Sequence, residues 1–341
     1  MPRYLVTGGS GYFGSLLVNR LGAENCRVFD INDADDRDPR TEFHRGDIRD
    51  PAAIAEAARG VEVMFHNVAQ VPLAKDRELF RTVNVDGTRN MLEAASRAGV
   101  AKVVYTSSSA VFGAPKTNPV TESTVPHPGE AYGTAKYEGE RLCEQYAVNG
   151  VDVSIIRPRT IMGHGRLGIF QILFEWIREG KNVPVLGGGG NVYQFVHAED
   201  LADACILAAA RPGPRVYNCG TDRFGSMREV LEALCRHAGT GSQVRSVPML
   251  PAVWAMKATS ALGVSPLGAY HALMYGRSMY FDITRATSEL GWKPRWSNDE
   301  MFIQSYEWYC RNREAVLAAH GASHHRSAVK QGALALLQWF L

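Results

Sequence analysis

Residues 131–140 read AYGTAKYEGE and place a tyrosine, Tyr132, four residues before a lysine, Lys136. Helix-forming Ala, Glu and Lys surround the pair, and four residues make roughly one helical turn, so the phenol and the ammonium would share a helix face. A neighbouring cation favours the phenolate over the phenol, which would let this tyrosine exchange a proton near neutral pH. Ordinary solvated helices also carry this spacing, so the rest of the chain must decide whether the pair is chemical or structural.

Three consecutive serines, Ser107, Ser108 and Ser109, follow the apolar segment VVYT. That segment has the composition of a buried strand. In an open α/β sheet, ligands bind beyond the carboxyl ends of the strands, so a serine at this place could bond a substrate. The alternative is that the serines only cap a turn.

A glycine-rich turn, VTGGSGYFG, follows the first apolar run and opens a helical stretch. Its glycines would let the turn close and let the backbone approach a pyrophosphate, while the helix N-terminus supplies N–H donors and a positive dipole end. A tight turn that merely starts a helix is the alternative. We expect the turn to bind a dinucleotide through Gly8, Gly11, Tyr12, Phe13 and Gly14.

An acidic residue at the end of the second apolar run, CRVFDI, supports the dinucleotide interpretation. Asp30 is placed to accept hydrogen bonds from an adenosine ribose diol and would repel a 2′-phosphate. Since Ile31 and Asn32 follow rather than arginines, NAD is favoured over NADP, with Asn32 also near the cofactor and Arg37 as the opposing signal. In GDIRD, Asp47 and Ile48 are expected at the adenine.

These candidate residues need a scaffold, and the chain predicts one. Short apolar runs alternate with helical stretches, which implies a mostly parallel sheet covered on both faces. The expected strands are 3–9, 26–31, 61–69, 100–109 and 151–160, and the helices between them include 15–24, 82–99 and 131–150. Beyond about residue 160 the alternation loosens, and helices are expected at 198–211 and 226–239 with a strand at 215–220.

Composition narrows the class of protein. The 341 residues carry a formal net charge of +2, which gives no general attraction to nucleic acid or anionic membranes. The six cysteines are scattered without a C-x-x-C pair, which disfavours a zinc site and a disulfide framework. We find no signal peptide and no run of roughly 18 apolar residues, and expect a cytoplasmic protein without a transmembrane segment.

The order of glycine turn, serine and Tyr-x-x-x-Lys resembles the extended short-chain dehydrogenase/reductase family, in its NAD-dependent epimerase/dehydratase group. The resemblance covers residues 3–310, because NVDGT (84–88), FVHAEDLADA (195–204), YNCG (217–220) and ELGWKP (289–294) also look like motifs of that group. It implies an α/β fold, a Rossmann-type doubly wound parallel sheet with a smaller C-terminal substrate-binding lobe. We expect an NAD-binding core at 1–160, a lobe at 161–318 with some segments returning to the core, and a tail at 319–341.

The resemblance also assigns roles to residues. Tyr132 would be the acid/base on a substrate hydroxyl, and Lys136 would favour its phenolate and hold the nicotinamide ribose. The family's catalytic serine lies five residues before the glycine of the VFG turn, which selects Ser108, and Asn84 would help to order the site. The chemistry implied is hydride transfer between a carbinol carbon and NAD, without a metal. A homodimer built on the helix of Tyr132 and the preceding helix is also implied.

The type of reaction depends on two residues that follow Ser108. The family's sugar 4,6-dehydratases have an acidic pair where this chain has Ser109 and Ala110, so elimination has no evident catalyst. Two reactions remain: epimerisation of a nucleotide-activated sugar through a keto intermediate, which we favour, and release of the ketone by a dehydrogenase acting on a sugar or a lipophilic alcohol. A catalytically silent NAD-binding regulatory protein is a third possibility, opposed by the intact Ser108, Tyr132 and Lys136.

Substrate residues depart from the family pattern. Thr160 stands where many epimerases have an asparagine, and Tyr193 with Gln194 stands where they have Arg-Asp. A diphosphate favours an arginine fork, for which Arg159, Arg166 and Arg277 are the candidates, although each could be a surface charge.

Other features have structural as well as functional readings. RPRTIMGHG and the apolar segment 248–282 resemble the 3β-hydroxysteroid-dehydrogenase-like branch, so a lipophilic substrate stays open; a lobe core or subunit interface would also explain the segment. For His66 and His197 we expect packing or hydrogen bonding.

Overall fold

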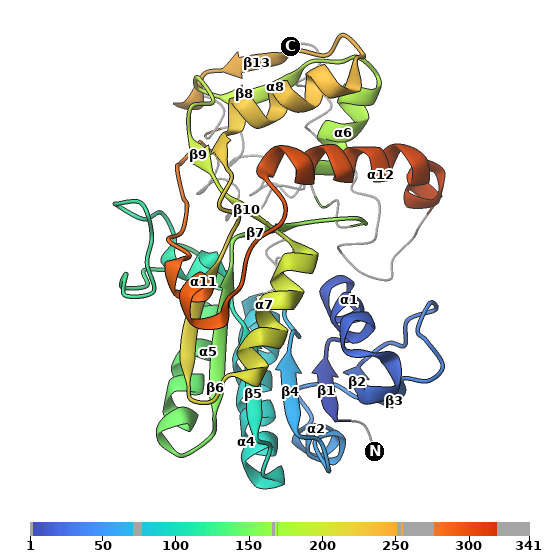
Figure 1. Cartoon of the computed structure of the whole chain (residues 1–341), viewed down its shortest axis with the longest axis vertical. Helices are drawn as coiled ribbons and strands as arrows, with labels where there is room; N and C mark the ends of the chain where they lie inside the picture. Colours follow the sequence, from blue (N-terminus) through green and yellow to red (C-terminus); the bar gives the residue numbers. More distant parts are fainter. Residues whose placement is uncertain are drawn as a thin grey trace.

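A computed structural model gives the arrangement of the chain (Figure 1) and describes residues 3–70, 77–165, 168, 170–250, 254 and 276–318. Arg166, the predicted tail 319–341 and residues 251–253 and 255–275 of the apolar segment lie outside the described residues. The other candidate residues named above are all described.

A seven-stranded sheet forms the lower half of the molecule in Figure 1, and every pairing in it is parallel. The strand order is β11-β6-β5-β4-β1-β2-β3. The chain starts in the middle at β1, adds β2 and β3 on one side, and then crosses to add β4 on the other, so β1 and β4 form a topological switch point. The strands are β1 (Tyr4–Thr7), β2 (Cys26–Asp30), β3 (Glu42–Arg45), β4 (Val63–His66), β5 (Lys102–Thr106), β6 (Val153–Pro158) and β11 (Arg215–Cys219).

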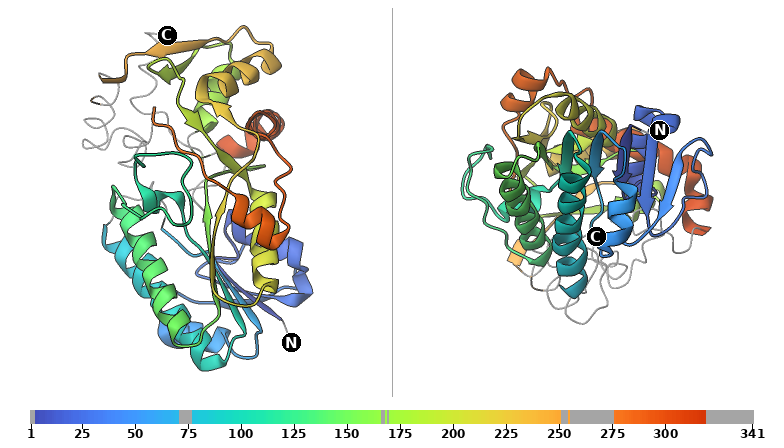
Figure 2. Two further views of the ribbon diagram at one scale, coloured as in Figure 1. Left: turned by 60° about the vertical axis from the view of Figure 1, so that its left-hand side comes forward. Right: turned by 90° about the horizontal axis from the view of Figure 1, so that it is seen from below.

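Helices cover both faces of this sheet, as the two views in Figure 2 show. Successive strand residues point to opposite faces: Leu5 belongs to the core under one helix layer and Val6 to the core under the other. The first layer contains α2 (Pro51–Ala57), α4 (Gly87–Ala98) and α5 (Ala131–Val148), and the second α1 (Tyr12–Leu21), α7 (Ala198–Ala210) and α11 (Thr284–Leu290). The predicted doubly wound α/β fold is confirmed.

Two short irregular helices connect the sheet to these layers. A short helix, α3 (Arg77–Arg81), continues into a π-helical segment, Thr82–Asp86, that leads directly into α4. After β5, a 3-10 turn spans Ser109–Phe112. The first segment precedes α4 and the second precedes α5, and both contact α5.

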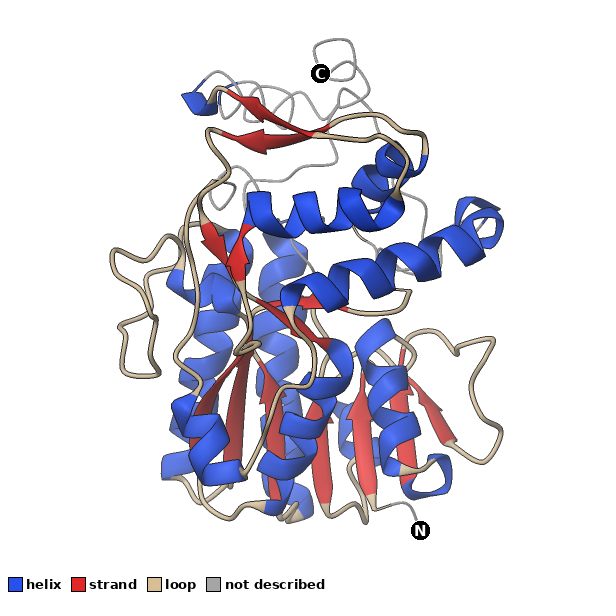
Figure 3. Cartoon of the chain, turned by 45° about the horizontal axis from the view of Figure 1, so that its top comes forward, coloured by secondary structure: helices blue, strands red, loops and turns tan. Residues whose placement is uncertain are grey.

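A smaller lobe lies beyond the carboxyl ends of the sheet strands (Figure 3). Its core is rich in aromatic residues, including Phe174, Trp176, Phe195, Phe302 and Tyr309. Within the described residues, the lobe contains three two-stranded pairs and three helices. The pairs are β7 (Thr160–Met162) with β10 (Phe195–His197), β8 (Val183–Leu186) with β13 (Val244–Val247), and β9 (Val192–Tyr193) with β12 (Gly225–Ser226); the helices are α6 (Phe170–Arg178), α8 (Met227–Ala238) and α12 (Asn298–Ala318).

The later half of the chain contributes to both parts. The segment expected as a strand at 215–220 is β11, the edge strand of the large sheet beside β6, and α7 packs on the same sheet. All six cysteines are free thiols, five of them buried. No helix among the described residues is long and apolar enough to cross a membrane.

Candidate active site

The glycine turn joins β1 to α1 at the switch point of the sheet. Gly8 has a positive φ of 72° and its carbonyl oxygen accepts the N–H of Gly11 at 3.1 Å. A Cβ on Gly14 would collide with that same carbonyl oxygen, so helix and turn can pack only with glycine there. No side chain caps the N-terminus of α1, which leaves that end of the helix to a ligand.

Polar atoms around the turn fit a dinucleotide. The hydroxyl oxygen of Ser10 and the side-chain nitrogen of Asn67 are buried without a hydrogen-bond partner, and Asn67 adjoins Gly8. A bound pyrophosphate and ribose would satisfy such groups. Phe13 is buried in the core below the turn, and Tyr12 directs its hydroxyl toward Gly163 after β7. The residues present therefore fit NAD.

Asp30 lies at the end of β2 beside this turn. Its carboxylate accepts the backbone N–H of Ser10 at 3.2 Å and of Asn32 at 3.4 Å. Burial raises the pKa of Asp30, and these N–H bonds oppose the rise. A carboxylate held in this position is ready to accept the hydroxyls of a ribose.

The expected adenine-end residues follow β3. The guanidinium of Arg49 forms an ion pair with Asp47 at 2.5 Å and lowers the pKa of its carboxyl, while Ile48 is buried. The Asp47 carboxylate is therefore already paired with a cation of its own loop, and its place at the adenine stays a prediction.

The helix that carries Tyr132 starts at a well-defined cap. The carboxylate of Glu130 accepts the N–H of Tyr132 at 2.7 Å and the N–H of Gly133 at 2.6 Å. Burial raises the pKa of Glu130, and the two N–H bonds oppose the rise. Phe80 packs edge-on against the half-buried Tyr132 ring, with centroids 6.2 Å apart. The cap and the ring contact fix where the phenol lies.

Lys136 is buried on the same helix face, one turn later. Its Nζ donates to the carbonyl oxygen of Thr106 at 2.8 Å and lies 4.9 Å from the centroid of the Tyr105 ring. Burial lowers the pKa of Lys136 to about 8, so the ammonium is still mostly protonated at pH 7. The protonated Nζ of Lys136 lies at the end of β5 and can therefore stabilise a phenolate and donate to a ribose hydroxyl.

The three serines have different surroundings. The Ser107 hydroxyl donates to Glu140 at 2.6 Å, and the Ser109 hydroxyl accepts from Arg159 at 2.8 Å; both serines are buried. Ser108 is half-buried, and its oxygen accepts the N–H of Ala110 at 3.1 Å, so its own hydroxyl can still donate. Only Ser108 of the three is both accessible and uncommitted as a donor.

Ser108 and Tyr132 are brought together by close backbone packing. A Cβ on Gly133 would run into the carbonyl oxygen of Ala110, so the start of α5 rests directly on the 3-10 turn after Ser108. The serine, the tyrosine and the lysine thus converge at the carboxyl end of β5.

A buried ion pair beneath these residues was missed by the sequence analysis. Arg157 donates to both carboxylate oxygens of Glu140, at 2.9 and 2.7 Å, and Ser107 completes the group. It ties β5, α5 and β6 together under the site. Glu140 lies four residues after Lys136 on the same helix face, but that spacing does not reveal its partner on β6, so the sequence held no local signal for the pair.

Asn84 lies in the π-helical segment and clamps the loop after β4. Its side chain accepts the N–H of Gln70 at 2.7 Å and donates to the carbonyl of the same residue at 3.1 Å. At the end of β4, His66 lies between the hydroxyls of Thr7 and Thr88, and burial, followed by the charge of Lys136, lowers its pKa to about 3. His66 is thus a neutral structural residue.

The expected substrate residues occupy the boundary between sheet and lobe. The hydroxyls of Thr160 and Tyr193 are hydrogen-bonded at 2.9 Å. The Arg159 guanidinium is buried and lies 4.5 Å from the Tyr193 ring centroid, whereas Arg277 is exposed. Gln194 is buried and donates to the carbonyl of Thr221 at 2.7 Å. Arg159, Thr160 and Tyr193 form one cluster, and Arg277 does not join it through any contact recorded for the described residues.

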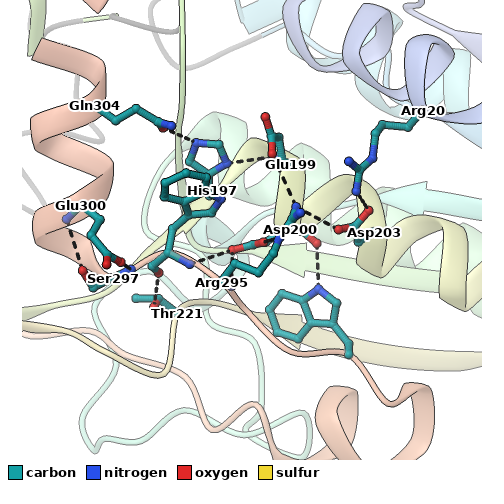
Figure 4. Close-up of polar contacts among 12 residues, drawn as sticks. Arg20, His197, Glu199, Asp200, Asp203, Thr221, Arg295, Ser297, Glu300 and Gln304 are labelled. Atoms are coloured by element: carbon teal, nitrogen blue, oxygen red, sulfur yellow. Dashed lines mark hydrogen bonds and ion pairs between the residues drawn. The ribbon is translucent and has the colours of Figure 1, made fainter. Parts of the chain in front are cut away.

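A second, partly exposed network joins the lobe to the sheet and involves the FVHAEDLADA and ELGWKP motifs (Figure 4). Asp200 on α7 accepts the N–H and the guanidinium of Arg295, both at 2.9 Å, and its carbonyl accepts the Trp292 indole at 2.7 Å. His197 stacks on Trp296 with centroids 4.8 Å apart and contacts Gln304. These motif residues connect α7, which packs on the sheet, to the segment that leads into α12 of the lobe.

Comparison with known proteins identifies the family to which the chain is similar. The model of the NAD dependent epimerase/dehydratase family matches residues 4–220. The chain is 53% identical over 340 residues (99% of the chain, 86% of the relative) to an uncharacterized protein, y4nG, of Sinorhizobium fredii. It is 30% identical to a UDP-glucose 4-epimerase of Mycolicibacterium smegmatis (91% and 99% covered) and 28% identical to a 3 beta-hydroxysteroid dehydrogenase/Delta 5-->4-isomerase of Mycobacterium tuberculosis (91% and 90%).

A solved structure shows the same fold. MoeE5 in complex with UDP-glucuronic acid and NAD superposes with a TM-score of 0.74 at 27% identity, covering 91% of this chain and 99% of that one.

Proposed function

The chain belongs to the NAD-dependent epimerase/dehydratase family, and we propose that it is an NAD-dependent epimerase of a nucleotide-activated sugar. The observation that carries the proposal is the convergence of Ser108, Tyr132 and Lys136 with uncharged residues directly after the serine. Such a site can remove and return a proton on a hydroxyl, but Ser109 and Ala110 supply no carboxylate for elimination directly after the catalytic serine.

Each catalytic residue has a task that its surroundings support. NAD, when bound, accepts a hydride from a carbinol carbon and returns it. Ser108 donates its hydroxyl hydrogen to the oxygen of that carbinol, and Tyr132 takes the hydroxyl proton as the carbonyl forms and gives it back on reduction. Lys136 stabilises the phenolate by its charge. Aligned geometry matters more than strong acidity in this reaction.

Inversion requires the keto sugar to present its other face before reduction. Tyr132 stays the acid/base in both half-reactions, so the same residues serve oxidation and reduction. The chain must therefore hold its cofactor tightly from the first half-reaction to the second, which distinguishes an epimerase from a dehydrogenase that exchanges NAD with solution.

Dehydration is opposed by the positions of the carboxylates nearby. Glu130 caps α5, Glu140 is paired with Arg157, and Glu122 accepts the N–H of Asn218 at 3.0 Å. Ser109 is bonded to Arg159. None of these acids is left to protonate a departing hydroxyl.

The comparisons support a nucleotide sugar as substrate, because relatives are named UDP-glucose 4-epimerase and a structural neighbour binds UDP-glucuronic acid. The 3 beta-hydroxysteroid dehydrogenase relative supports the alternative, an NAD-dependent dehydrogenase of a sugar or lipophilic alcohol. A silent regulatory protein would not need the intact catalytic set. Preference for NAD over NADP through Asp30, a homodimer built on α4 and α5 and a cytoplasmic location stay predictions.

The test is to incubate the protein as purified, without added cofactor, with UDP-, dTDP- and GDP-sugars. We expect the inverted sugar to accumulate without net NADH, since each cycle regenerates the oxidised cofactor. Strict dependence on added NAD with stoichiometric NADH would instead establish the dehydrogenase. A 4-keto-6-deoxy product would refute the argument from Ser109 and Ala110.

A further inference from the structure

Arg159 carries a buried guanidinium without a carboxylate partner among the described residues. Its side chain is 1% exposed. Nη1 donates to the Ser109 hydroxyl at 2.8 Å and to the Met279 sulfur at 3.3 Å, but Nε and Nη2 are buried without any partner. No carboxylate among the described residues lies within ion-pair distance of this guanidinium. A buried cation without an anion costs several kcal/mol, so its retention needs an explanation.

The unpartnered groups have a specific geometry. Nε and Nη2 lie on one edge of the guanidinium with their N–H bonds parallel, which is the arrangement that grips both oxygens of a carboxylate. The Tyr193 and Phe281 rings lie 4.5 and 5.6 Å from Cζ and fix the plane of that edge. Thr160 holds Tyr193 in turn through its hydroxyl at 2.9 Å. The edge is therefore preorganised before any ligand arrives.

The position of Arg159 identifies which part of a substrate it meets. The guanidinium contacts Ser109, which follows in the chain the serine expected to bond the reacting hydroxyl, Ser108. Arg277, in contrast, is exposed, two residues before the Met279 that pairs with Tyr193. A hydrated diphosphate suits the exposed cation, and one buried edge suits a single carboxylate close to the reacting carbon.

We propose that Arg159 binds a carboxylate on the sugar ring of the substrate, so that the preferred substrate is a nucleotide-activated sugar acid rather than a neutral sugar. This inference rests on the proposed function. It makes Arg159 a specificity-determining residue. The substrate carboxylate supplies the counter-charge for the guanidinium, whereas a neutral sugar leaves the guanidinium unpaired.

The experiment compares UDP-glucuronate with UDP-glucose as substrates of the wild type, Arg159→Met and Arg159→Lys, with Arg277→Met as matched control. We expect wild-type kcat/KM to favour UDP-glucuronate by about 100-fold, as losing one partner of a buried charge pair implies. Arg159→Met should remove that preference, and Arg159→Lys should restore part of it. Binding of UDP alone should be unchanged in Arg159→Met and weakened in Arg277→Met.

Three results would overturn the inference while leaving the proposed function intact. One is equal wild-type use of both substrates; another is an equal loss on both in Arg159→Met, which indicates a structural role. The third is weaker binding of UDP alone by Arg159→Met, which would assign the guanidinium to the diphosphate. If the folded, NAD-bound wild type neither binds nor converts any nucleotide sugar, the proposed function fails first.

Discussion

Two sets of residues come from the same three stretches of chain, the end of β5, helix α5 and the end of β6, and they differ in what they are bonded to. Ser107, Glu140 and Arg157 are buried and satisfy one another. Ser108, Lys136 and Arg159 lie one, four and two residues away in the chain, and each keeps donor capacity for a ligand. We call the first set the scaffold group and the second the ligand group. Burial alone does not separate them, because Glu140, Lys136, Arg157 and Arg159 are all at most 4% exposed.

The difference teaches how stability and chemistry are divided. A satisfied buried pair supports the fold only while both partners remain, since loss of one leaves an unpaired charge. An unsatisfied buried group costs stability in the resting protein and gains its partner when a ligand binds. Substitutions in the two groups should therefore move different quantities.

The largest expected effect is in the chemistry. Tyr132→Phe should lower kcat by about 10³-fold, because the proton transfer is lost while the ring and its contact with Phe80 remain. NAD binding and the free energy of unfolding should stay close to wild type. The measurement is turnover of the best substrate of the panel together with NAD titration and urea unfolding.

Tyr146→Phe is the control for that variant, on the same helix. Its hydroxyl donates to Glu93 at 2.9 Å, so its loss should cost about 1 kcal/mol of stability and leave turnover unchanged. An active Tyr132→Phe protein would remove the phenol from the mechanism.

The next effect compares the two arginines at the end of β6. Arg157→Met strands the fully buried Glu140 carboxylate and should lower the free energy of unfolding by about 3–5 kcal/mol. Arg159→Met removes a charge that has no counter-ion and should leave that free energy within about 1 kcal/mol of wild type or raise it. Urea unfolding of the two ligand-free variants measures both. Equal destabilisation would mean that Arg159 belongs to the scaffold group.

The fold and the candidate catalytic residues could be predicted from the sequence, but the pairings within the two groups could not. The fold could be predicted because strands buried on both faces give continuous apolar runs, and because the glycine turn marks where the first of them ends. The spacing of Tyr132 and Lys136 raised the pair as a candidate, and the resemblance to the family's motifs selected Ser108 and assigned the three roles. The convergence of these residues follows from the packing of α5, whose first turn rests on the 3-10 turn that follows Ser108 at the end of β5.

The pairings that separate scaffold from ligand residues could not be predicted, because they are tertiary. Arg157 and Arg159 look alike in the sequence, and only folding brings Glu140 to one and Met279, 120 residues away, to the other. Arg159 was a candidate for a diphosphate on charge alone. Its burial depends on the Tyr193 and Phe281 rings that pack around it, and so does the unpartnered edge from which we infer a carboxylate ligand.

The smallest expected effect tests the division at neighbouring serines. Ser107→Ala removes one donor from Glu140, which keeps both bonds from Arg157, so stability should fall by about 1 kcal/mol with turnover retained. Ser108→Ala removes the acceptor that caps the 3-10 turn, so stability should also fall by about 1 kcal/mol, but kcat should fall by about 100-fold, because the Ser108 hydroxyl is the donor to the substrate oxygen. Thermal unfolding and turnover are measured on both variants under one set of conditions. If the Ser107 variant loses turnover and the Ser108 variant does not, the choice among the three serines is wrong, and the boundary between the two groups must be redrawn at the end of β5.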